Sequence, residues 1–295
     1  MPEAMSMDMG APPTVQQALL HAQAMGLARI DAQLLLLHVT GREKAGRAWL
    51  LTHDQDLLDA AQASAYAALC ARRLDAEPVA YLIGHKEFYG LELAVDARVL
   101  DPRPDTETLV DWALELMPAD GAACRVADLG TGSGAIALAL QSQRPAACVW
   151  AVDASAGALA VAQANAQRLA LPVRFAQGSW LEPLAGQPAF GLIVSNPPYI
   201  REDDPHLAAL VHEPLSALAS GTDGLADIRA IIAQAPARLA AGGWLLLEHG
   251  WDQAEAVAAL LHAAGFGQVQ HRHDLAGVAR CTGGQWSGQA CTGPA

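Results

Sequence analysis

The sequence of 295 residues has few basic side chains and few aromatic rings. It carries 18 Lys and Arg against 31 Asp and Glu, which gives a formal net charge of −13 at pH 7, and only 5% of its residues are Phe, Trp or Tyr. Proteins that bind nucleic-acid backbones rely on clustered positive charge, and no basic stripe is visible along this chain. We therefore expect no direct nucleic-acid binding.

Cysteine is also scarce, and long apolar runs are missing. The five cysteines are odd in number and none belongs to a Cys-x-x-Cys pair, so reduced thiols are the simplest interpretation. No apolar run approaches the length of a membrane span, and the first residues lack the basic segment of a signal peptide. His271 and His273 have no companion ligands at a suggestive spacing. We expect a cytoplasmic protein with no metal and no membrane partner.

A glycine-rich loop predicts a site for an adenosine-type cofactor. An apolar run at 125–129 precedes the loop, and a helical stretch at 135–141 follows it. The loop consists of Gly130, Thr131, Gly132, Ser133 and Gly134. Glycines let the backbone approach a ligand, and the helix N-terminus supplies unpaired N–H groups. A second apolar run leads to Asp153, whose carboxylate can accept both hydroxyl groups of a ribose.

A nicotinamide dinucleotide is the obvious competitor for this loop. The pattern Gly130-x-Gly132-x-x-Ala135 also satisfies the relaxed dinucleotide fingerprint. Asp128 lies just ahead of the glycines, where its charge would repel a pyrophosphate but suits a sulfonium ligand with an amino-acid tail. We therefore favour S-adenosylmethionine, and we expect Asp128 to face the ligand rather than to be a strand-end hydrogen-bond acceptor.

The segment Asn196-Pro197-Pro198-Tyr199 follows an apolar run at 190–194, where α/β enzymes place catalytic loops. Two consecutive prolines remove two backbone donors and leave carbonyl acceptors. The Asn196 side chain adds an acceptor, and the Tyr199 ring offers a flat face for a planar group. An ordinary turn is the alternative, because Asn-Pro is common in turns. The combination of acceptors and ring suits a planar NH2-bearing substrate.

Taken together, these motifs resemble the release-factor glutamine methyltransferases, within the class I S-adenosylmethionine-dependent enzymes. The resemblance extends from about residue 77 to residue 280. It is carried by the two loops and by Glu87-Phe88-Tyr89-Gly90-Leu91, Pro102-Arg103-Pro104-Asp105-Thr106-Glu107, Glu213-Pro214 with Ala217-Leu218, Asp223-Gly224-Leu225 and Leu247-Glu248-His249-Gly250. Asp101 is a departure, since related sequences usually have an aliphatic residue before Pro-Arg-Pro.

The resemblance implies methylation of the side-chain amide nitrogen of the glutamine in the Gly-Gly-Gln motif of class I peptide chain release factors. Asn196 Oδ1 and the Pro197 carbonyl would accept the two amide hydrogens, and Tyr199 would pack on the amide plane. The whole segment from Asn196 to Tyr199 would bind substrate, and Asn196 would also contact the cofactor. The glycine loop would hold the methionine end, Asp153 the ribose and Trp180 the adenine; a core tryptophan is the alternative for Trp180.

The pattern of apolar residues predicts an α/β protein with a doubly wound seven-stranded, Rossmann-like sheet. The expected strands are 125–129, 148–152, 173–176, 190–194, 244–248, 267–271 and 278–282. Helical periodicity over 15–75, broken at Gly26, at Gly41 and around 52–54, predicts a small N-terminal bundle. We expect a disordered tail at 1–13, a helical substrate-docking domain at 14–78, a β-hairpin linker at 79–102, the methyltransferase domain at 103–286 and a tail at 287–295.

Several questions stay open at the level of sequence. Arg103 and Glu107 could form an ion pair or contact the ligands, and Glu213 and Glu248 have no assigned role beyond structural hydrogen bonding. Residues 283–285 repeat the Gly-Gly-Gln substrate motif, which we interpret as chance. The rival functions are an adenine-amino DNA or RNA methyltransferase, a nicotinamide-dependent oxidoreductase and a non-catalytic partner of the translation machinery. A monomer is favoured.

Overall fold

The computed structural model describes residues 12–120, 122 and 124–288, which divide between two compact units, Met1–Ile83 and Gly84–Ala295. The expected tails at 1–13 and 287–295 lie almost entirely outside the described residues. Within the described part of the chain, no helix is both long and apolar enough to cross a membrane.

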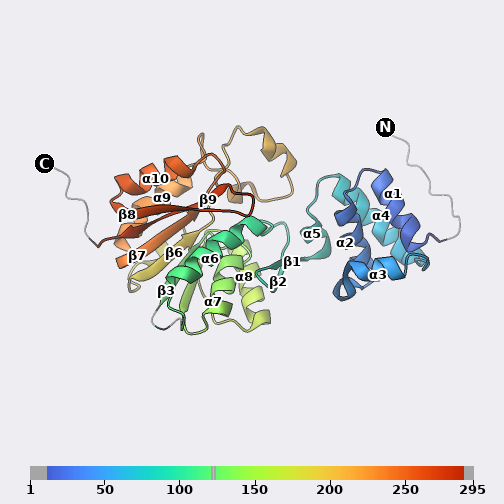
Figure 1. Ribbon diagram of the computed structural model, residues 1–295, viewed down its shortest axis with the longest axis horizontal. Coiled ribbons are helices and arrows are strands. Elements are labelled where there is room, and N and C mark those ends of the chain that lie inside the picture. The colour runs from blue at the N-terminus through green and yellow to red at the C-terminus, as the bar shows by residue number, and fades with distance from the viewer. Residues whose placement is uncertain (1–11, 121, 123, 289–295) are drawn as a thin grey trace. The chain divides into compact units, whose positions relative to one another are not determined.

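The N-terminal unit is a small bundle of helices, as predicted (Figure 1). Its helices are α1 (Val15–Ala24), α2 (Arg29–Val39), the 3-10 turn η1 (Glu43–Ala45), α3 (Gly46–Thr52), α4 (Ala60–Leu74) and α5 (Val79–Ile83). Thr14 and Asp59 each form a capping box with the glutamine three residues later, which fixes where α1 and α4 begin. The core of this unit is built around α2, with Leu35 and Leu36 fully buried.

The segment expected to be a hairpin over 79–102 begins instead with α5. Residues 79–83 are all apolar, and so short an apolar run fits a helical turn as well as a strand; the prediction of strand there is wrong. The hairpin is formed by β1 (His85–Phe88) and β2 (Leu91–Ala94). Tyr89 and Gly90 both have positive φ, the conformation of a two-residue type I′ turn.

The second unit contains a seven-stranded sheet in the order β5-β4-β3-β6-β7-β9-β8 (Figure 1). Its strands are β3 (Arg125–Leu129), β4 (Cys148–Asp153), β5 (Arg174–Gln177), β6 (Phe190–Ser195), β7 (Leu239–Glu248), β8 (Phe266–His273) and β9 (Ala279–Trp286). All neighbouring pairs from β5 to β7 are parallel, and β9 runs antiparallel to both β7 and β8. All seven predicted strands are confirmed, and β7, β8 and β9 are each at least three residues longer than predicted.

Helices cover both faces of the sheet and bury two separate clusters. The helices are α6 (Glu107–Leu116), α7 (Ala135–Gln143), α8 (Ala156–Leu169), α9 (Ala226–Gln234) and α10 (Ala254–Ala263), with 3-10 turns η2 (Pro104–Thr106), η3 (Glu182–Leu184), η4 (Pro205–Ala209), η5 (Leu215–Ala217) and η6 (Ala235–Ala237). Residues of α6 and α7 pack in one cluster, and residues of α9 and α10 in the other. In β3, Val126 belongs to the first cluster and Ala127 to the second, as the alternation of a strand requires.

Candidate active site

The strand order places a crevice at the carboxyl ends of β3 and β6. The chain continues from β3 to β4 and β5 on one side, whereas β6 pairs with β3 on the other side. Ligands of open α/β sheets bind at such a reversal point. Ser195 Oγ donates to the Leu129 carbonyl oxygen at 2.7 Å and holds the two strand ends together. The glycine loop and Asn196 therefore start side by side.

The glycine loop is shaped by left-handed backbone and by the Asp153 carboxylate. Gly130 and Gly132 have φ values of 69° and 55°, which L side chains rarely adopt. The Gly132 N–H donates to Asp153 Oδ2 at 2.9 Å, and the Ser155 N–H donates to Oδ1 at 2.9 Å. These two bonds fix the Asp153 side chain at the end of β4, beside the loop.

Gly134 is the N-cap residue just ahead of α7, where the packing is tight. A Cβ atom there would lie 3.0 Å from Leu138 Cδ1 and 3.2 Å from Ala162 Cβ. Asn165 of α8 donates to the Ser133 carbonyl at 2.9 Å, and it also pairs with the backbone of Ala94 in the hairpin. The loop is thus held from behind by α8, a contact that the sequence patterns did not indicate.

Asp128 does not face the crevice, and that expectation is wrong. It is fully buried, its Oδ2 accepts from Thr131 Oγ1 at 2.6 Å and from the Ala137 N–H at 3.1 Å, and it does not line either pocket described below. Burial raises the pKa of this carboxyl to about 7. The Asp128 carboxyl thus accepts hydrogen bonds from the buried Thr131 side chain and from the first turn of α7, and it stabilises the turn between β3 and α7 from the protein interior.

A pocket of about 1020 Å³, open to solvent, lies over the glycine loop. Five of the predicted cofactor residues line the pocket: Gly130, Gly132, Asp153, Trp180 and Asn196. The other three loop residues, Thr131, Ser133 and Gly134, are buried and do not line it. The Trp180 ring stands against Gly130, where an added Cβ would lie 3.3 Å from Cζ3. Lining residues missed at the sequence level include Arg98, Val99, Leu100, Ser216, Ala217 and Asp227; only Ala217 belonged to a recognised motif.

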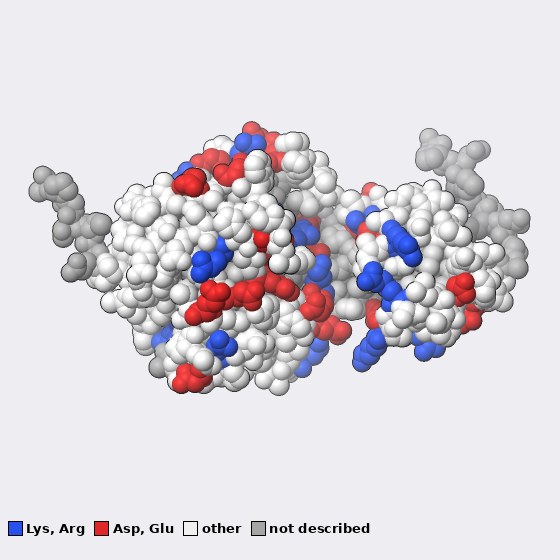
Figure 2. All heavy atoms as spheres, viewed as in Figure 1, with Lys and Arg blue, Asp and Glu red and all other residues white. Residues whose placement is uncertain are grey.

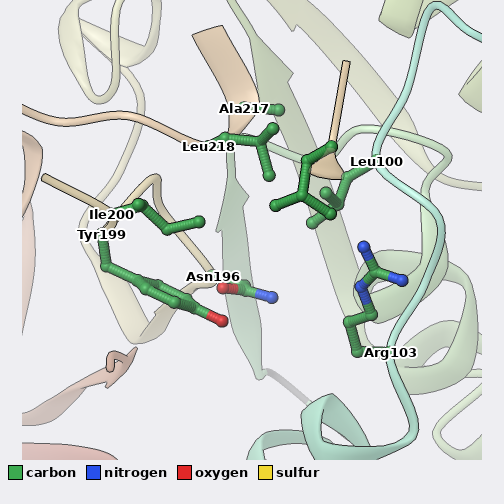
Figure 3. A pocket seen from close by; sticks show the side chains of 8 residues that line it. Leu100, Arg103, Asn196, Tyr199, Ile200, Ala217 and Leu218 are labelled. Carbon is green, nitrogen blue, oxygen red and sulfur yellow. The ribbon is translucent and has the colours of Figure 1, made fainter. Parts of the chain in front are cut away.

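A second, smaller pocket of about 450 Å³ adjoins the first (Figure 3). Asn196 and Tyr199 line it, together with the apolar side chains Leu100, Ile200, Leu210, Ala217 and Leu218 and with Arg103. Asn196, Leu100 and Ala217 also line the larger pocket. Pro198 lines only the larger pocket, and Pro197 lines neither. Asn196 therefore stands at the junction between the two spaces.

Arg103 is held in the smaller pocket by acidic side chains. Its Nη2 donates to Glu213 Oε1 at 2.5 Å, and its Nη1 lies 3.6 Å from Asp101. Asp101, the departure from the family pattern, is buried and also pairs with Lys86 at 3.3 Å. The acidic residue is thus accommodated by two cations. The Arg103–Glu213 ion pair ties the segment ahead of α6 to the 200–221 segment that walls both pockets.

Arg103 and Glu107 do not form the ion pair that the sequence left open. Glu107 Oε1 instead accepts from the Tyr89 N–H at 3.0 Å in the hairpin turn. The turn η2 lies between Arg103 and Glu107, and the two side chains contact different parts of the protein. Arg103 contacts the pocket, and Glu107 supports the hairpin.

Two buried polar residues lie beneath Asn196. Asn196 Nδ2 donates to Thr106 Oγ1 at 3.1 Å. Glu248, at the end of β7, is 1% exposed; burial raises the pKa of its carboxyl to about 7, against weaker opposing effects of hydrogen bonds from Thr106 and Asn196. Burial and the charge of Glu248 also raise the pKa of Tyr199 to about 12. The tyrosine is therefore a neutral phenol at physiological pH.

The internal Gly-Gly-Gln sequence is part of the sheet. Gly283 pairs with Leu246 of β7 on one side and with Gln270 of β8 on the other. The Gln285 side chain donates from Nε2 to the Gly242 carbonyl at 2.9 Å. A residue paired on both edges cannot enter an active site without opening the sheet. This arrangement supports the interpretation that the sequence match is chance.

Acidic side chains gather over α6 on the face of the second unit seen in Figure 2. Glu107, Asp111 and Glu115 follow one another at four-residue intervals along this helix, so they share one side of it. Arg272 pairs with Glu115 at 3.2 Å and lies over the Trp112 ring. This face offers no continuous positive surface to a nucleic-acid backbone.

A doubly wound sheet with a glycine loop and an Asn-Pro-Pro-Tyr loop at its reversal point defines a Rossmann-like methyltransferase. The family models agree: residues 16–84 match the PrmC N-terminal domain, and residues 110–270 match the methyltransferase small domain. Relatives named release factor glutamine methyltransferase are 46–52% identical over most of this chain, so the chain belongs to that family, whose members use S-adenosylmethionine.

Curated relatives cover nearly the whole chain. The release factor glutamine methyltransferase of Bordetella pertussis is 52% identical over 261 residues, which are 88% of this chain and 95% of the relative. The protein of that name from Escherichia coli is 46% identical over 275 residues, 92% of this chain and 97% of the relative. The earlier resemblance to this family is confirmed.

Solved structures support the fold. A methyltransferase from Pyrococcus furiosus has a TM-score of 0.52 at 18% identity, with 74% of this chain and 98% of that chain covered. The 16S rRNA N2 G1207 methyltransferase RsmC of T. thermophilus also has a TM-score of 0.52, at 21% identity, with 68% and 49% covered. At these identities the likeness concerns the fold alone.

Proposed function

We propose that this chain transfers the methyl group of S-adenosylmethionine to the side-chain amide nitrogen of the glutamine in the Gly-Gly-Gln motif of class I peptide chain release factors. The observation that carries the proposal is the position of Asn196, which lines both the pocket over the glycine loop and the smaller pocket beside Tyr199. A group at this junction can hold an acceptor nitrogen next to a methyl donor.

The larger pocket fits the cofactor. Gly132 lines it with a left-handed backbone, and a Cβ atom added there would meet nothing within 4 Å, so the glycine leaves open space for a ligand. Asp153 holds the ribose hydroxyls and Trp180 the adenine; the glycine loop holds the methionine end. When bound, S-adenosylmethionine supplies an electrophilic methyl group on a positively charged sulfur.

The smaller pocket holds the glutamine side chain. In Figure 3 the amide oxygen of Asn196 lies on the side of Tyr199, and its nitrogen on the side of Arg103. The nitrogen is engaged by Thr106 at 3.1 Å, which leaves Oδ1 available as an acceptor. In this proposal Asn196 Oδ1 and the Pro197 carbonyl accept the two amide hydrogens of the substrate, and the Tyr199 ring packs on the amide plane. The lining of the pocket supports the roles of Asn196 and Tyr199, whereas Pro197 lines neither pocket and its role rests on the family resemblance.

The site activates the substrate by positioning its amide nitrogen rather than by deprotonating it with a general base. An amide nitrogen is a poor nucleophile because its lone pair is delocalised into the carbonyl group. Two acceptors direct the nitrogen and stabilise the positive charge that grows on it during attack. The Tyr199 phenol, whose pKa burial raises to about 12, does not take the proton near pH 7. The proton leaves afterwards to water, and the apolar lining of the pocket keeps competing water from the amide.

The protein substrate needs a larger surface than this pocket. A glutamine side chain alone buries too little area for selection among proteins. We assign docking of the release factor to the N-terminal helical unit, with the enzyme acting as a cytoplasmic monomer. An adenine-amino methyltransferase would use the same loop, but the net charge of −13 and the acidic surface over α6 disfavour it.

The variant Asn196→Ala tests the proposal. Removing an acceptor that acts on developing charge lowers turnover by about 100- to 1000-fold. We expect this fall in kcat with a class I release factor as substrate, whereas cofactor binding measured by calorimetry weakens by less than about tenfold. His206→Ala, at an exposed residue of the 200–221 segment, is the control and keeps wild-type kcat. Full turnover by Asn196→Ala at saturating substrate would refute the assigned role.

A further inference from the structure

Beneath the proposed active site lies a polar cluster that the proposed function leaves without a role. Thr106 and Glu248 are 4% and 1% exposed, and neither lines a pocket. Thr106 reaches Asn196 Nδ2 at 3.1 Å. Glu248 Oε2 has no hydrogen-bond partner within the described residues. A buried carboxyl with an unpartnered oxygen is destabilising, so its presence beneath Asn196 calls for a functional reason.

We propose that Thr106 and Glu248 are positioning residues that orient the Asn196 amide, so that Oδ1 and not Nδ2 faces the substrate nitrogen. This inference rests on the proposed function, because it explains how the acceptor role of Asn196 is enforced. An asparagine amide has nearly the same shape when its oxygen and nitrogen are exchanged, so steric fit alone does not select the orientation. Hydrogen bonding has to select it.

The hydrogen-bond donors and acceptors of Thr106 and Glu248 select the orientation of the Asn196 amide. The Thr106 hydroxyl has one hydrogen to donate, and an ionised Glu248 can only accept. When Thr106 accepts from Asn196 Nδ2, its own hydrogen remains free to be donated to Glu248. In the reversed orientation the Asn196 oxygen and the Glu248 carboxylate would compete for this one hydrogen. They would also repel each other. An ionised Glu248 thus favours the orientation that presents Oδ1 to the substrate.

Protonation of Glu248 weakens this preference. A protonated carboxyl can donate to Thr106, whose hydrogen is then free to turn toward Asn196 and to stabilise the reversed amide. Burial raises the pKa of Glu248 to about 7, so the change falls near neutral pH. The titratable groups that act on Glu248 or are acted on by it are Asp105 ahead of α6, Tyr199 after β6, and Arg280 and Cys281 of β9. Turnover therefore increases as the pH rises through about 7.

The test compares Thr106→Val, Thr106→Ser and Glu248→Gln with the wild type, using S-adenosylmethionine and an intact class I release factor. Valine keeps the shape of threonine without the hydroxyl, so we expect kcat to fall by about 10- to 100-fold, the scale of one lost buried hydrogen bond. The KM for the release factor and the affinity for the cofactor stay within about twofold. Thr106→Ser restores the hydroxyl and returns kcat to within about threefold of the wild type.

The pH profile separates orientation from stability. In Glu248→Gln we expect a lower kcat and loss of the increase near pH 7, while Asp128, the other carboxyl with a pKa near 7, remains in place. Thermal unfolding identifies any variant that is not folded. Wild-type kcat in Thr106→Val, equal damage in Thr106→Val and Thr106→Ser, or an unchanged pH profile in Glu248→Gln would each overturn the inference.

Failure of the inference and failure of the proposed function give different results. If Asn196→Ala is inactive while Thr106→Val and Glu248→Gln match the wild type, only the orienting role is wrong. If Asn196→Ala keeps full turnover, or if the wild type transfers no methyl group to the release factor, the proposed function itself fails.

Discussion

Replacement of Gly283 by alanine gives a sharp test of the interpretation that the internal Gly-Gly-Gln is structural. A Cβ atom at Gly283 would lie 2.5 Å from Leu246 Cδ2, 2.8 Å from the Leu245 carbonyl oxygen and 2.8 Å from the Trp112 ring. Real Cβ atoms do not approach other atoms so closely, and one of the three atoms is backbone in the centre of the sheet. Gly283 therefore leaves room for the packing of Trp112 on the strand.

The size of the effect follows from overpacking. Extra atoms in a packed core destabilise proteins by about 1–3 kcal/mol, and three simultaneous contacts place Gly283→Ala at the upper end, about 3 kcal/mol. For a unit of this size, each kcal/mol lowers the unfolding temperature by about 2–4 °C, so we expect a fall of about 6–12 °C. Thermal unfolding followed by circular dichroism measures it.

Gly267→Ala is the matched control, because it lies in the neighbouring strand β8 and faces Gln285. A Cβ atom at Gly267 would meet only the Gln285 carbonyl oxygen, at 4.0 Å, so we expect a change within about 0.5 kcal/mol. If Gly283→Ala unfolds within 2 °C (roughly 1 kcal/mol or less) of Gly267→Ala, the packing explanation is refuted. Methylation of Gln285 in protein incubated with cofactor alone would refute the view that the motif is inaccessible.

Two further predictions concern the buried and ligand-facing carboxylates. The folded-state pKa of Glu248 is raised from 4.5 to about 7, so its contribution to stability is present below pH 4.5 and is lost as the pH rises to about 7. Glu248→Gln should therefore stabilise the protein by about 2 kcal/mol more at pH 8 than at pH 5.5, measured by denaturant unfolding; an equal effect at both pH values would contradict this. Asp153→Ala should weaken cofactor binding by about 10- to 100-fold in calorimetry, since charged hydrogen bonds are lost. The control Asp252→Ala, at an exposed position outside the pockets, should leave cofactor binding unchanged. Equal cofactor affinities of the two variants would exclude the ribose role of Asp153.

The parts of the fold and site that could be predicted from sequence are those with local signals. The glycine loop depends on left-handed residues that only glycine adopts readily, and Gly130 and Gly132 have that conformation. The strands of a parallel sheet are buried on both faces, so they stand out as apolar runs. At 79–83 the same signal was too short to distinguish a helix from a strand.

Contacts between distant segments could not be predicted. Asn196 meets Thr106 across 90 residues of sequence, and Arg103 meets Glu213 across 110. Neither pairing leaves a periodic or spacing signal in one sequence. The direction of the Asp128 side chain is a related case: the sequence places Asp128 beside the loop, but only its contacts with Thr131 and with the start of α7 show that the side chain points inward.

The most direct test of the central claim is the identity of the methylated residue. The purified protein is incubated with isotopically labelled S-adenosylmethionine and either a class I release factor, the same factor with its motif glutamine replaced by alanine, or DNA, and the product is mapped by peptide mass spectrometry. We predict label on the motif glutamine of the intact factor and none with the alanine variant or DNA. Label in adenine, or no transfer to the release factor, would contradict the account.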